Sequence, residues 1–162
     1  MDFTYRNVTP AVPFLDSPRK VVILAHGFVS SGLTPWMIEL QESILDIVSG
    51  VCPRSISVLD YLKFFRWQNT FQEDAIVIVV DWYRGSNPLN TYRQCVVNTE
   101  LVGRQIAVVL QKLREMSPKS VNSERTHFIG HSLGAHIGKF FAQYFRKISG
   151  GATIGRITGM FL

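Results

Sequence analysis

Two uninterrupted runs of branched apolar residues restrict this chain to very few architectures. The first runs from Lys20 to Ala25 and the second from Ala75 to Val80. Such runs are typical of strands buried on both faces, which occur mainly in parallel sheets covered by helices. Apolar residues at helical spacing follow each run, so strand and helix alternate along the chain. This alternation predicts an α/β fold, with a mostly parallel sheet and flanking helices.

The first helix is marked by its capping residues. Thr34 is suited to the N-cap position, and Pro35 to the first helical position. Apolar residues then recur every four positions and predict the face that packs on the sheet, which comprises Trp36, Leu40, Ile44 and Val48.

Two further helices and two further strands are predicted by the same periodicities. Helices are expected over 91–116 and 133–146, and strands over 126–129 and from about residue 154. The apolar stripe of the longer helix is expected to comprise Val97, Leu101, Ile106, Val109, Leu110 and Leu113.

The connection between the first helix and the second apolar run is longer than such connections usually are. Segment 51–72 accounts for the excess and is rich in aromatic residues. One interpretation is an insertion at the surface that acts as a lid. The other is a retained intron, because valine codons begin with GT and Phe71 and Gln72 can be encoded TTTCAG. Removing the segment would join Gly50 to Glu73 in frame and restore a short loop.

The net charge of +5 raises the question of an anionic partner. The lysines and arginines are scattered singly or in pairs, without a basic stripe or the interleaved aromatic residues of single-strand binders. We therefore predict no nucleic-acid partner. No apolar run is long enough for a transmembrane segment, and the first residues lack the apolar core of a signal peptide, so neither is expected in this chain.

The motif that carries chemistry is Gly130-His131-Ser132-Leu133-Gly134, which lies between a predicted strand and a predicted helix. A sharp turn at that junction strains the serine backbone, and the two glycines avoid clashes between Cβ atoms. Ser132 Oγ would then be presented as a nucleophile at the carboxyl end of the sheet. The alternative is an ordinary tight turn in which the serine is merely small.

A nucleophilic serine needs N–H donors for the oxyanion that forms during acyl transfer. One donor comes from the residue after the serine, and the other from the loop after an earlier strand. Leu133 fits the first position, and Phe28, in His26-Gly27-Phe28, fits the second. The Phe28 ring would face the acyl pocket, or else belong to the core. His26 is expected to orient this loop.

Other polar residues near these motifs are expected to be structural. His131 and His136 are expected to pack or form hydrogen bonds rather than act as a base, and His127 to be half-exposed in its strand. Asp81, directly after the second apolar run, is expected to orient a loop.

These motifs resemble those of the pancreatic lipase family, which includes triacylglycerol lipases and phospholipases A1. The resemblance covers most of the chain outside 50–72. It rests on His26-Gly27-Phe28 with Trp36, Val80-Asp81-Trp82, Gln94, Asn98 and Val102 within 92–103, Ile129 to His136, and Thr153 to Gly159.

The resemblance implies an α/β-hydrolase fold and a secreted, extracellular enzyme of lipid catabolism. It implies hydrolysis of lipid carboxylic esters at a lipid–water interface, by acyl transfer to Ser132 and then to water. The oxyanion donors fall on Phe28 and Leu133, and no metal or other cofactor takes part. The choice between triglyceride and phospholipid, and the oligomeric state, are left open.

The chain departs from the family pattern after the nucleophile. The family's triad acid lies in Gly-Leu-Asp-Pro-Ala, but here Gly159 is followed by Met160-Phe161-Leu162, with Phe161 in place of the aspartate. The catalytic histidine has no counterpart, and no acidic residue follows Glu124. We therefore expect 1–162 to be a partial lipase domain, truncated after the nucleophile helix and the following strand, and nearly inactive by itself.

A function of another class is a non-catalytic lipid-binding or yolk-storage homologue, because a lipase-like fold can lose its triad and keep its pocket. Ser132 and its two flanking glycines count against this alternative, because a binding protein needs no exposed nucleophile.

Overall fold

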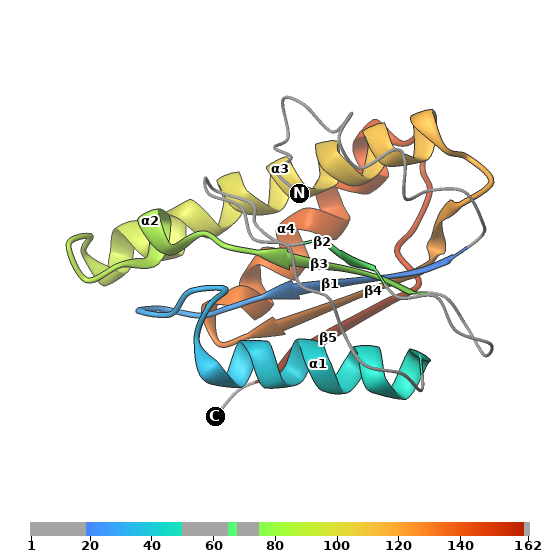
Figure 1. Cartoon of the computed structure of the whole chain (residues 1–162). Helices are drawn as coiled ribbons and strands as arrows, with labels where there is room; N and C mark the ends of the chain where they lie inside the picture. The colour runs from blue at the N-terminus through green and yellow to red at the C-terminus, as the bar shows by residue number, and fades with distance from the viewer. Residues whose placement is uncertain (1–18, 50–64, 68–74, 161–162) are drawn as a thin grey trace.

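The computed structural model describes residues 19–49, 65–67 and 75–160 (Figure 1). Its sheet has the strand order β2-β3-β1-β4-β5, in which β2 is antiparallel to β3 and every other pair is parallel. The predicted α/β fold with a mostly parallel sheet is therefore confirmed. In chain order the elements are β1 (Arg19–Ala25), α1 (Pro35–Ser49), β2 (Phe65–Trp67), β3 (Ala75–Val80), α2 (Tyr83–Ser86), α3 (Tyr92–Met116), β4 (Val121–His131), α4 (Leu133–Ile148) and β5 (Arg156–Met160).

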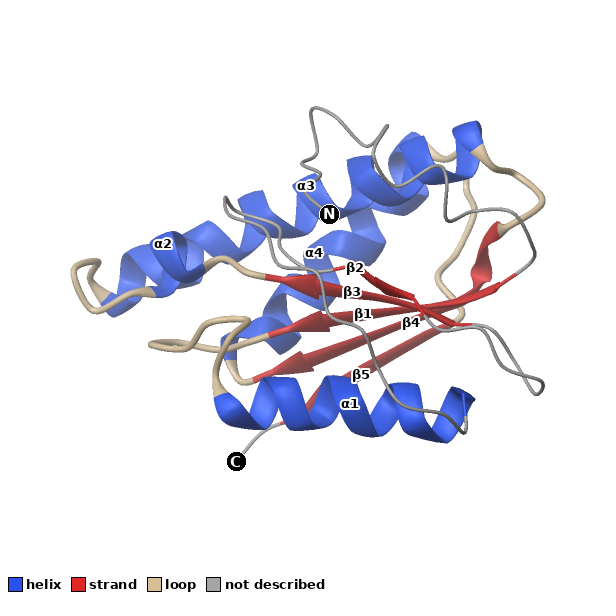
Figure 2. Cartoon of the chain, viewed as in Figure 1, coloured by secondary structure: helices blue, strands red, loops and turns tan. Residues whose placement is uncertain are grey.

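The sheet is covered on both faces, by α1 on one side and by α3 and α4 on the other (Figure 2). Successive residues of β1 point to opposite faces, so Val21 and Ile23 join the α3/α4 core while Val22 and Leu24 join the α1 core. This explains the unbroken apolar runs of β1 and β3. The predicted face of α1 is confirmed at Trp36, Leu40 and Ile44, while the side chain of Val48 lies outside the described residues.

The buried face of α3 differs from the prediction in its first half. Val97 and Leu101 are each 59% exposed. Gly103 sets the orientation of the helix, since a Cβ at this position would lie 2.8 Å from the Ile137 carbonyl oxygen of α4. Leu101 lies about 200° around the helix from that contact and therefore faces away. The buried residues include Cys95, Val102, Ile106, Ala107, Val109, Leu110 and Leu113.

The last two strands have different limits from those predicted. β4 begins at Val121 rather than at Thr126. The prediction omitted its first half because that stretch is polar and contains both buried and exposed positions. The register between β1 and β4 also shifts in this region. β5 begins at Arg156, two residues after Ile154, and extends to Met160.

Segment 51–72 is described only at Phe65–Trp67, which form the antiparallel edge strand β2. The rest of the segment lies outside the described residues. Its interpretation as an insertion or a retained intron therefore stays a prediction.

Candidate active site

Ser132 occupies the turn between β4 and α4 in a strained backbone conformation. Its φ is 54° and its ψ is −119°, a region that glycine adopts readily and serine does not. The Ser132 N–H donates to the Met160 carbonyl of β5 over 2.8 Å, and the Ser132 carbonyl accepts from the Ala135 N–H over 3.0 Å. Strain of this kind costs about 1–3 kcal/mol and persists only where surrounding contacts enforce it. The predicted sharp turn is thus present.

The two glycines of the motif are required by backbone contacts. A Cβ on Gly130 would lie 2.3 Å from the Gly134 carbonyl oxygen. A Cβ on Gly134 would lie 2.3 Å from the Ala25 carbonyl oxygen and 2.8 Å from that of His26. The first turn of α4 therefore rests directly on the end of β1, which is how the serine reaches the loop that follows β1.

The loop after β1 lies against the serine. A Cβ on Gly27 would lie 2.8 Å from Ser132 Cβ and 3.3 Å from Ser132 Oγ. Within the described residues, no hydrogen bond occupies the backbone N–H of Phe28 or of Leu133. Both groups are therefore available as donors, although their role as oxyanion donors stays a prediction.

The Phe28 side chain lies at the margin of the core. Its half-buried ring packs against the α3/α4 core cluster. The ring also meets that of Tyr92 edge to face, with 5.3 Å between centroids. This contact joins the loop after β1 to the start of α3.

Val29 is the second strained residue at this edge of the sheet. Its φ is 51°, which is rare for a branched side chain. The Val29 N–H donates to the Ser86 carbonyl over 2.9 Å, and this bond from α2 helps to hold the loop. Among the described residues, Val29 and Ser132 are the only non-glycine residues with a positive φ.

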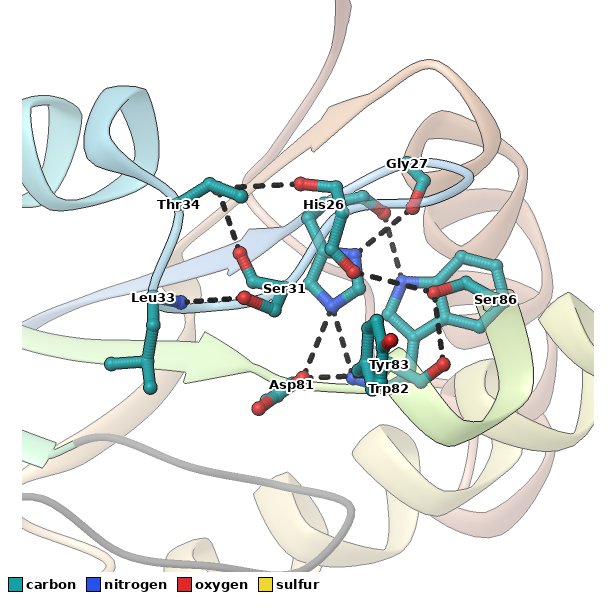
Figure 3. Close-up of polar contacts among 10 residues, drawn as sticks. His26, Gly27, Ser31, Leu33, Thr34, Asp81, Trp82, Tyr83 and Ser86 are labelled. Carbon is teal, nitrogen blue, oxygen red and sulfur yellow. Dashed lines mark hydrogen bonds and ion pairs between the residues drawn. The ribbon is translucent and has the colours of Figure 1, made fainter. Parts of the chain in front are cut away.

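A buried network fixes the loop after β1 to the loop after β3 (Figure 3). His26 Nδ1 lies 3.0 Å from the Gly27 carbonyl oxygen and donates to it, which leaves Nε2 to accept the Trp82 backbone N–H over 3.1 Å. Trp82 Nε1 donates to the His26 carbonyl over 2.8 Å, and the two rings stack. Both side chains are fully buried. These contacts support the expectation that His26 orients the loop.

Asp81 joins the same network from the end of β3. Its Oδ1 lies 3.3 Å from His26 Nε2 and accepts the Tyr83 backbone N–H over 3.0 Å. Burial opposes ionisation of this carboxyl, but the adjacent His26 ring and the hydrogen bond from the Tyr83 N–H outweigh it and lower its pKa. These contacts support the expectation that Asp81 orients the loop after β3.

Asp81 should make stability depend on acidity. Because its pKa is lower in the folded chain, its contribution is complete above the ordinary value of 3.8 and is lost as the pH falls through the folded pKa. Urea unfolding between pH 5.5 and pH 2.5 measures this loss. Asp81→Asn should flatten the low-pH decline, while Glu115→Asn, a surface change, should not. Equal declines in the wild-type chain and Asp81→Asn would contradict the assignment.

The other histidines do not reach the serine. The ring of His131 packs on Trp36, with 4.8 Å between centroids, and its buried Nδ1 has no hydrogen-bond partner among the described residues. His127 is half-buried and bonds Thr158 Oγ1 over 2.9 Å; burial, with the positive Arg156 and Lys20, lowers its pKa. His136 is exposed. Within the described residues, no hydrogen bond reaches Ser132 Oγ, and so no general base is in place there.

Trp82, Gln94 and Asn98 are named in the sequence only as part of the family pattern, without a role, and Ser86 is not singled out there, although all four join the loops together. Trp82 and Ser86 are buried, and Asn98 Nδ2 donates to the Gly85 carbonyl over 2.9 Å, which attaches α2 to α3. Gln94 in turn donates to Asn98 Oδ1 over 3.0 Å. A signal was available, because polar residues that follow neighbouring parallel strands meet at one edge of the sheet.

A hollow of the surface lies away from this edge. It has a volume of about 370 Å³ and lies between the end of α3 and the start of β4, beside Arg114, Val121 and Ser149. Among the described residues, no cluster of three histidine, cysteine or acidic side chains could share a metal ion, and no helix is long and apolar enough to cross a bilayer.

Comparison with known proteins agrees with this geometry. The family model described as Lipase matches residues 11–161. The chain is 32% identical over 142 residues to pancreatic lipase-related protein 2 of Sus scrofa, and 32% identical over 142 residues to pancreatic triacylglycerol lipase of Mus musculus. These matches cover 88% of this chain and 23% of each relative.

A third relative extends the match further along the chain. Lipase member H-A of Xenopus laevis is 29% identical over 160 residues, which is 98% of this chain and 25% of that relative. The chain thus spans about a quarter of the length of the curated relatives it matches. From the family match and the fold together, the chain belongs to the lipase family.

Proposed function

We propose that this chain is part of an enzyme that hydrolyses the carboxylic esters of lipids, with Ser132 as the nucleophile. The observation that carries the proposal is the position of Gly27 against Ser132 Oγ, which brings the loop after β1 to the strained serine. Membership of the lipase family supports the reaction class, and the names of the relatives support a lipid substrate.

The reaction proceeds in two acyl transfers. Ser132 Oγ attacks the ester carbonyl carbon and loses its proton to a general base, and the carbonyl oxygen becomes an oxyanion. The N–H groups of Phe28 and Leu133 stabilise this charge. Collapse expels the alcohol, which takes up a proton, and leaves an acyl group on Ser132. Water then attacks the acyl group, releases the fatty acid and restores the serine.

The 162 residues by themselves are proposed to react slowly. Within the described residues no histidine or carboxylate contacts Ser132 Oγ, and a serine without a base is a weak nucleophile. The oxyanion donors and the binding of substrate then supply the remaining acceleration, about 10³–10⁴-fold over water in a serine hydrolase without its triad. By family resemblance, the enzyme is proposed to act outside the cell in lipid catabolism.

A phosphonate probe tests this proposal without requiring turnover. We expect a p-nitrophenyl alkylphosphonate to modify the purified chain slowly at one residue, with release of p-nitrophenolate. Intact-mass spectrometry and peptide mapping should place the adduct on Ser132. Added imidazole should accelerate the modification, because it can take the proton that no described side chain near Ser132 is positioned to accept.

Two variants separate the serine from other nucleophiles. Ser132→Ala should abolish the adduct, and Ser149→Ala, at the end of α4, should leave it unchanged. Modification elsewhere, or none with imidazole present, would contradict a nucleophilic Ser132. Rapid turnover of a short-chain ester by this chain, lost in Ser132→Ala, would contradict the slow reaction proposed for the 162 residues.

A further inference from the structure

Phe28 lies between two peptide groups that are each held by a hydrogen bond. The Gly27 carbonyl belongs to the same planar peptide as the Phe28 N–H, and it accepts from His26 Nδ1 over 3.0 Å (Figure 3). The next peptide carries the Val29 N–H, which donates to the Ser86 carbonyl over 2.9 Å. Because each peptide group is planar, the two bonds together fix the direction of the Phe28 N–H, the candidate oxyanion donor.

The second of these bonds holds a residue in an unfavourable conformation. Val29 has a φ of 51° and is 52% exposed, so burial contributes little to keeping it there. Strain of this kind persists only where neighbouring contacts enforce it. Ser86 supplies such contacts, because its carbonyl accepts the Val29 N–H and its Oγ lies 3.5 Å from the Ser30 carbonyl oxygen. If Ser86 moved, Val29 would be free to relax, and the peptide groups beside Phe28 would turn with it.

Ser86 is the last residue of α2, a single turn of four residues that is too short to be stable by itself. One end of this turn is fixed, because the Trp82 carbonyl accepts the Gly85 and Ser86 N–H groups and Trp82 is bonded to His26. At the other end, the Gly85 carbonyl has no partner within so short a helix. Asn98 of α3 supplies one, since its Nδ2 donates to that carbonyl over 2.9 Å.

Asn98 is itself held in the orientation that this bond requires. Gln94, one helical turn earlier on α3, donates from Nε2 to Asn98 Oδ1 over 3.0 Å, which directs Asn98 Nδ2 toward α2. Asn98 is half-buried and lies against Gly85, where an added Cβ would be 3.6 Å from Nδ2. The Asn98 amide therefore links the long helix α3 to the short helix that holds Val29.

We propose that Asn98 is a positioning residue for the Phe28 oxyanion donor, acting through α2 on the strained backbone of Val29. The inference rests on the proposed function, because the direction of the Phe28 N–H affects the reaction only if Ser132 is the nucleophile. It adds a residue that has no hydrogen bond to Phe28 or Ser132 within the described part of the chain, yet sets how well the oxyanion is bound.

Two phosphonate probes that differ in one atom test the inference. In the p-nitrophenyl alkylphosphonate, the phosphoryl oxygen accepts from the oxyanion donors while Ser132 Oγ attacks phosphorus. The serine proton passes to added imidazole, and p-nitrophenolate leaves. The second probe has sulfur in place of the phosphoryl oxygen, and sulfur is a weak hydrogen-bond acceptor. The ratio of the two modification rates, oxygen probe over sulfur probe, therefore measures how well the donors are aimed.

Asn98→Ala should lower this ratio about tenfold, because losing an oxyanion donor costs about 10²–10³-fold and here the Phe28 N–H is displaced rather than lost. Asn122→Ala, which changes an exposed asparagine in the first half of β4, should leave the ratio unchanged. In a Val29→Gly background, Asn98→Ala should lower the ratio only about twofold, because glycine has no strain to relieve.

A purely structural role for Asn98 would give a different result. Asn98→Ala would then slow both probes equally and leave the ratio unchanged, which would overturn the inference. An equal fall in the ratio with valine and with glycine at residue 29 would also overturn it, because the strain of Val29 would then have no part in the effect.

Amide hydrogen exchange separates this inference from the proposed function, because it does not depend on the chemistry of Ser132. The Val29 amide should exchange about fivefold faster in Asn98→Ala, since its bond to Ser86 would open more often. The Ser132 amide, which is bonded to β5, should be unchanged. If neither probe modifies any variant and Val29 exchange still responds, the serine chemistry is wrong and the attachment of the loop through Asn98 stands. If modification is normal and neither readout depends on Asn98, the positioning inference alone is wrong.

Discussion

Gly134→Ala is expected to lower the free energy of unfolding by about 3 kcal/mol, a large part of the stability of a domain of this size. The added Cβ would lie 2.3 Å from the Ala25 carbonyl oxygen, so α4 would have to move away from the end of β1. The clash cannot be relieved by a side-chain rotation, because the carbonyl oxygens of Ala25 and His26 that the Cβ would meet belong to the backbone. Urea unfolding followed by circular dichroism would measure the change.

Gly150→Ala is the matched control for this substitution. Gly150 has a φ of 73° but no atom of the described residues within 4 Å of the position of a Cβ, so alanine would suffer only the conformational cost of about 1 kcal/mol. At Gly134 the φ is not positive, so an alanine there would suffer from the close contact alone. If the two variants lose equal stability, the close approach of α4 to β1 does not explain the glycine at 134.

Ser132→Gly is expected to abolish phosphonate modification while raising the free energy of unfolding by about 1 kcal/mol. Glycine adopts the φ of 54° and ψ of −119° without strain, and this relief outweighs its greater loss of backbone freedom on folding. Intact-mass spectrometry and urea unfolding would measure the two effects on the same protein.

Ser132→Ala separates the hydroxyl from the strain. Alanine also removes the nucleophile, but it keeps the Cβ and therefore the unfavourable conformation, so its stability should stay near that of the wild-type chain. Equal stability of the glycine and alanine variants would mean that the backbone at residue 132 stores no strain that a catalytic serine must bear.

The parts of the fold that leave an apolar run or a motif could be predicted from the sequence. β1 and β3 are buried on both faces, so nearly every residue in them is apolar. The serine turn could also be predicted, because Gly130 and Gly134 lie where a Cβ would clash with the backbone. The first half of β4 could not be found this way, because Asn122, Glu124 and Arg125 are exposed and leave no apolar run.

The orientation of α3 also could not be predicted from its own residues. Its first half has apolar residues on two sides, and the choice between them is made by the contact of Gly103 with α4, which is a tertiary feature. For the same reason the network of His26 and Trp82 is visible only when β1 and β3 are known to be neighbours.

The hydrogen bond from the Ser132 N–H to the Met160 carbonyl has a consequence for the order in which the molecule is assembled. β4 and α4 precede β5 in the chain, so during synthesis the turn between them leaves the ribosome before its partner exists. Until β5 has paired with β4, one of the contacts that enforce the conformation of Ser132 is missing. The backbone geometry of the candidate nucleophile is therefore complete only after β5 has been synthesised and has paired with β4.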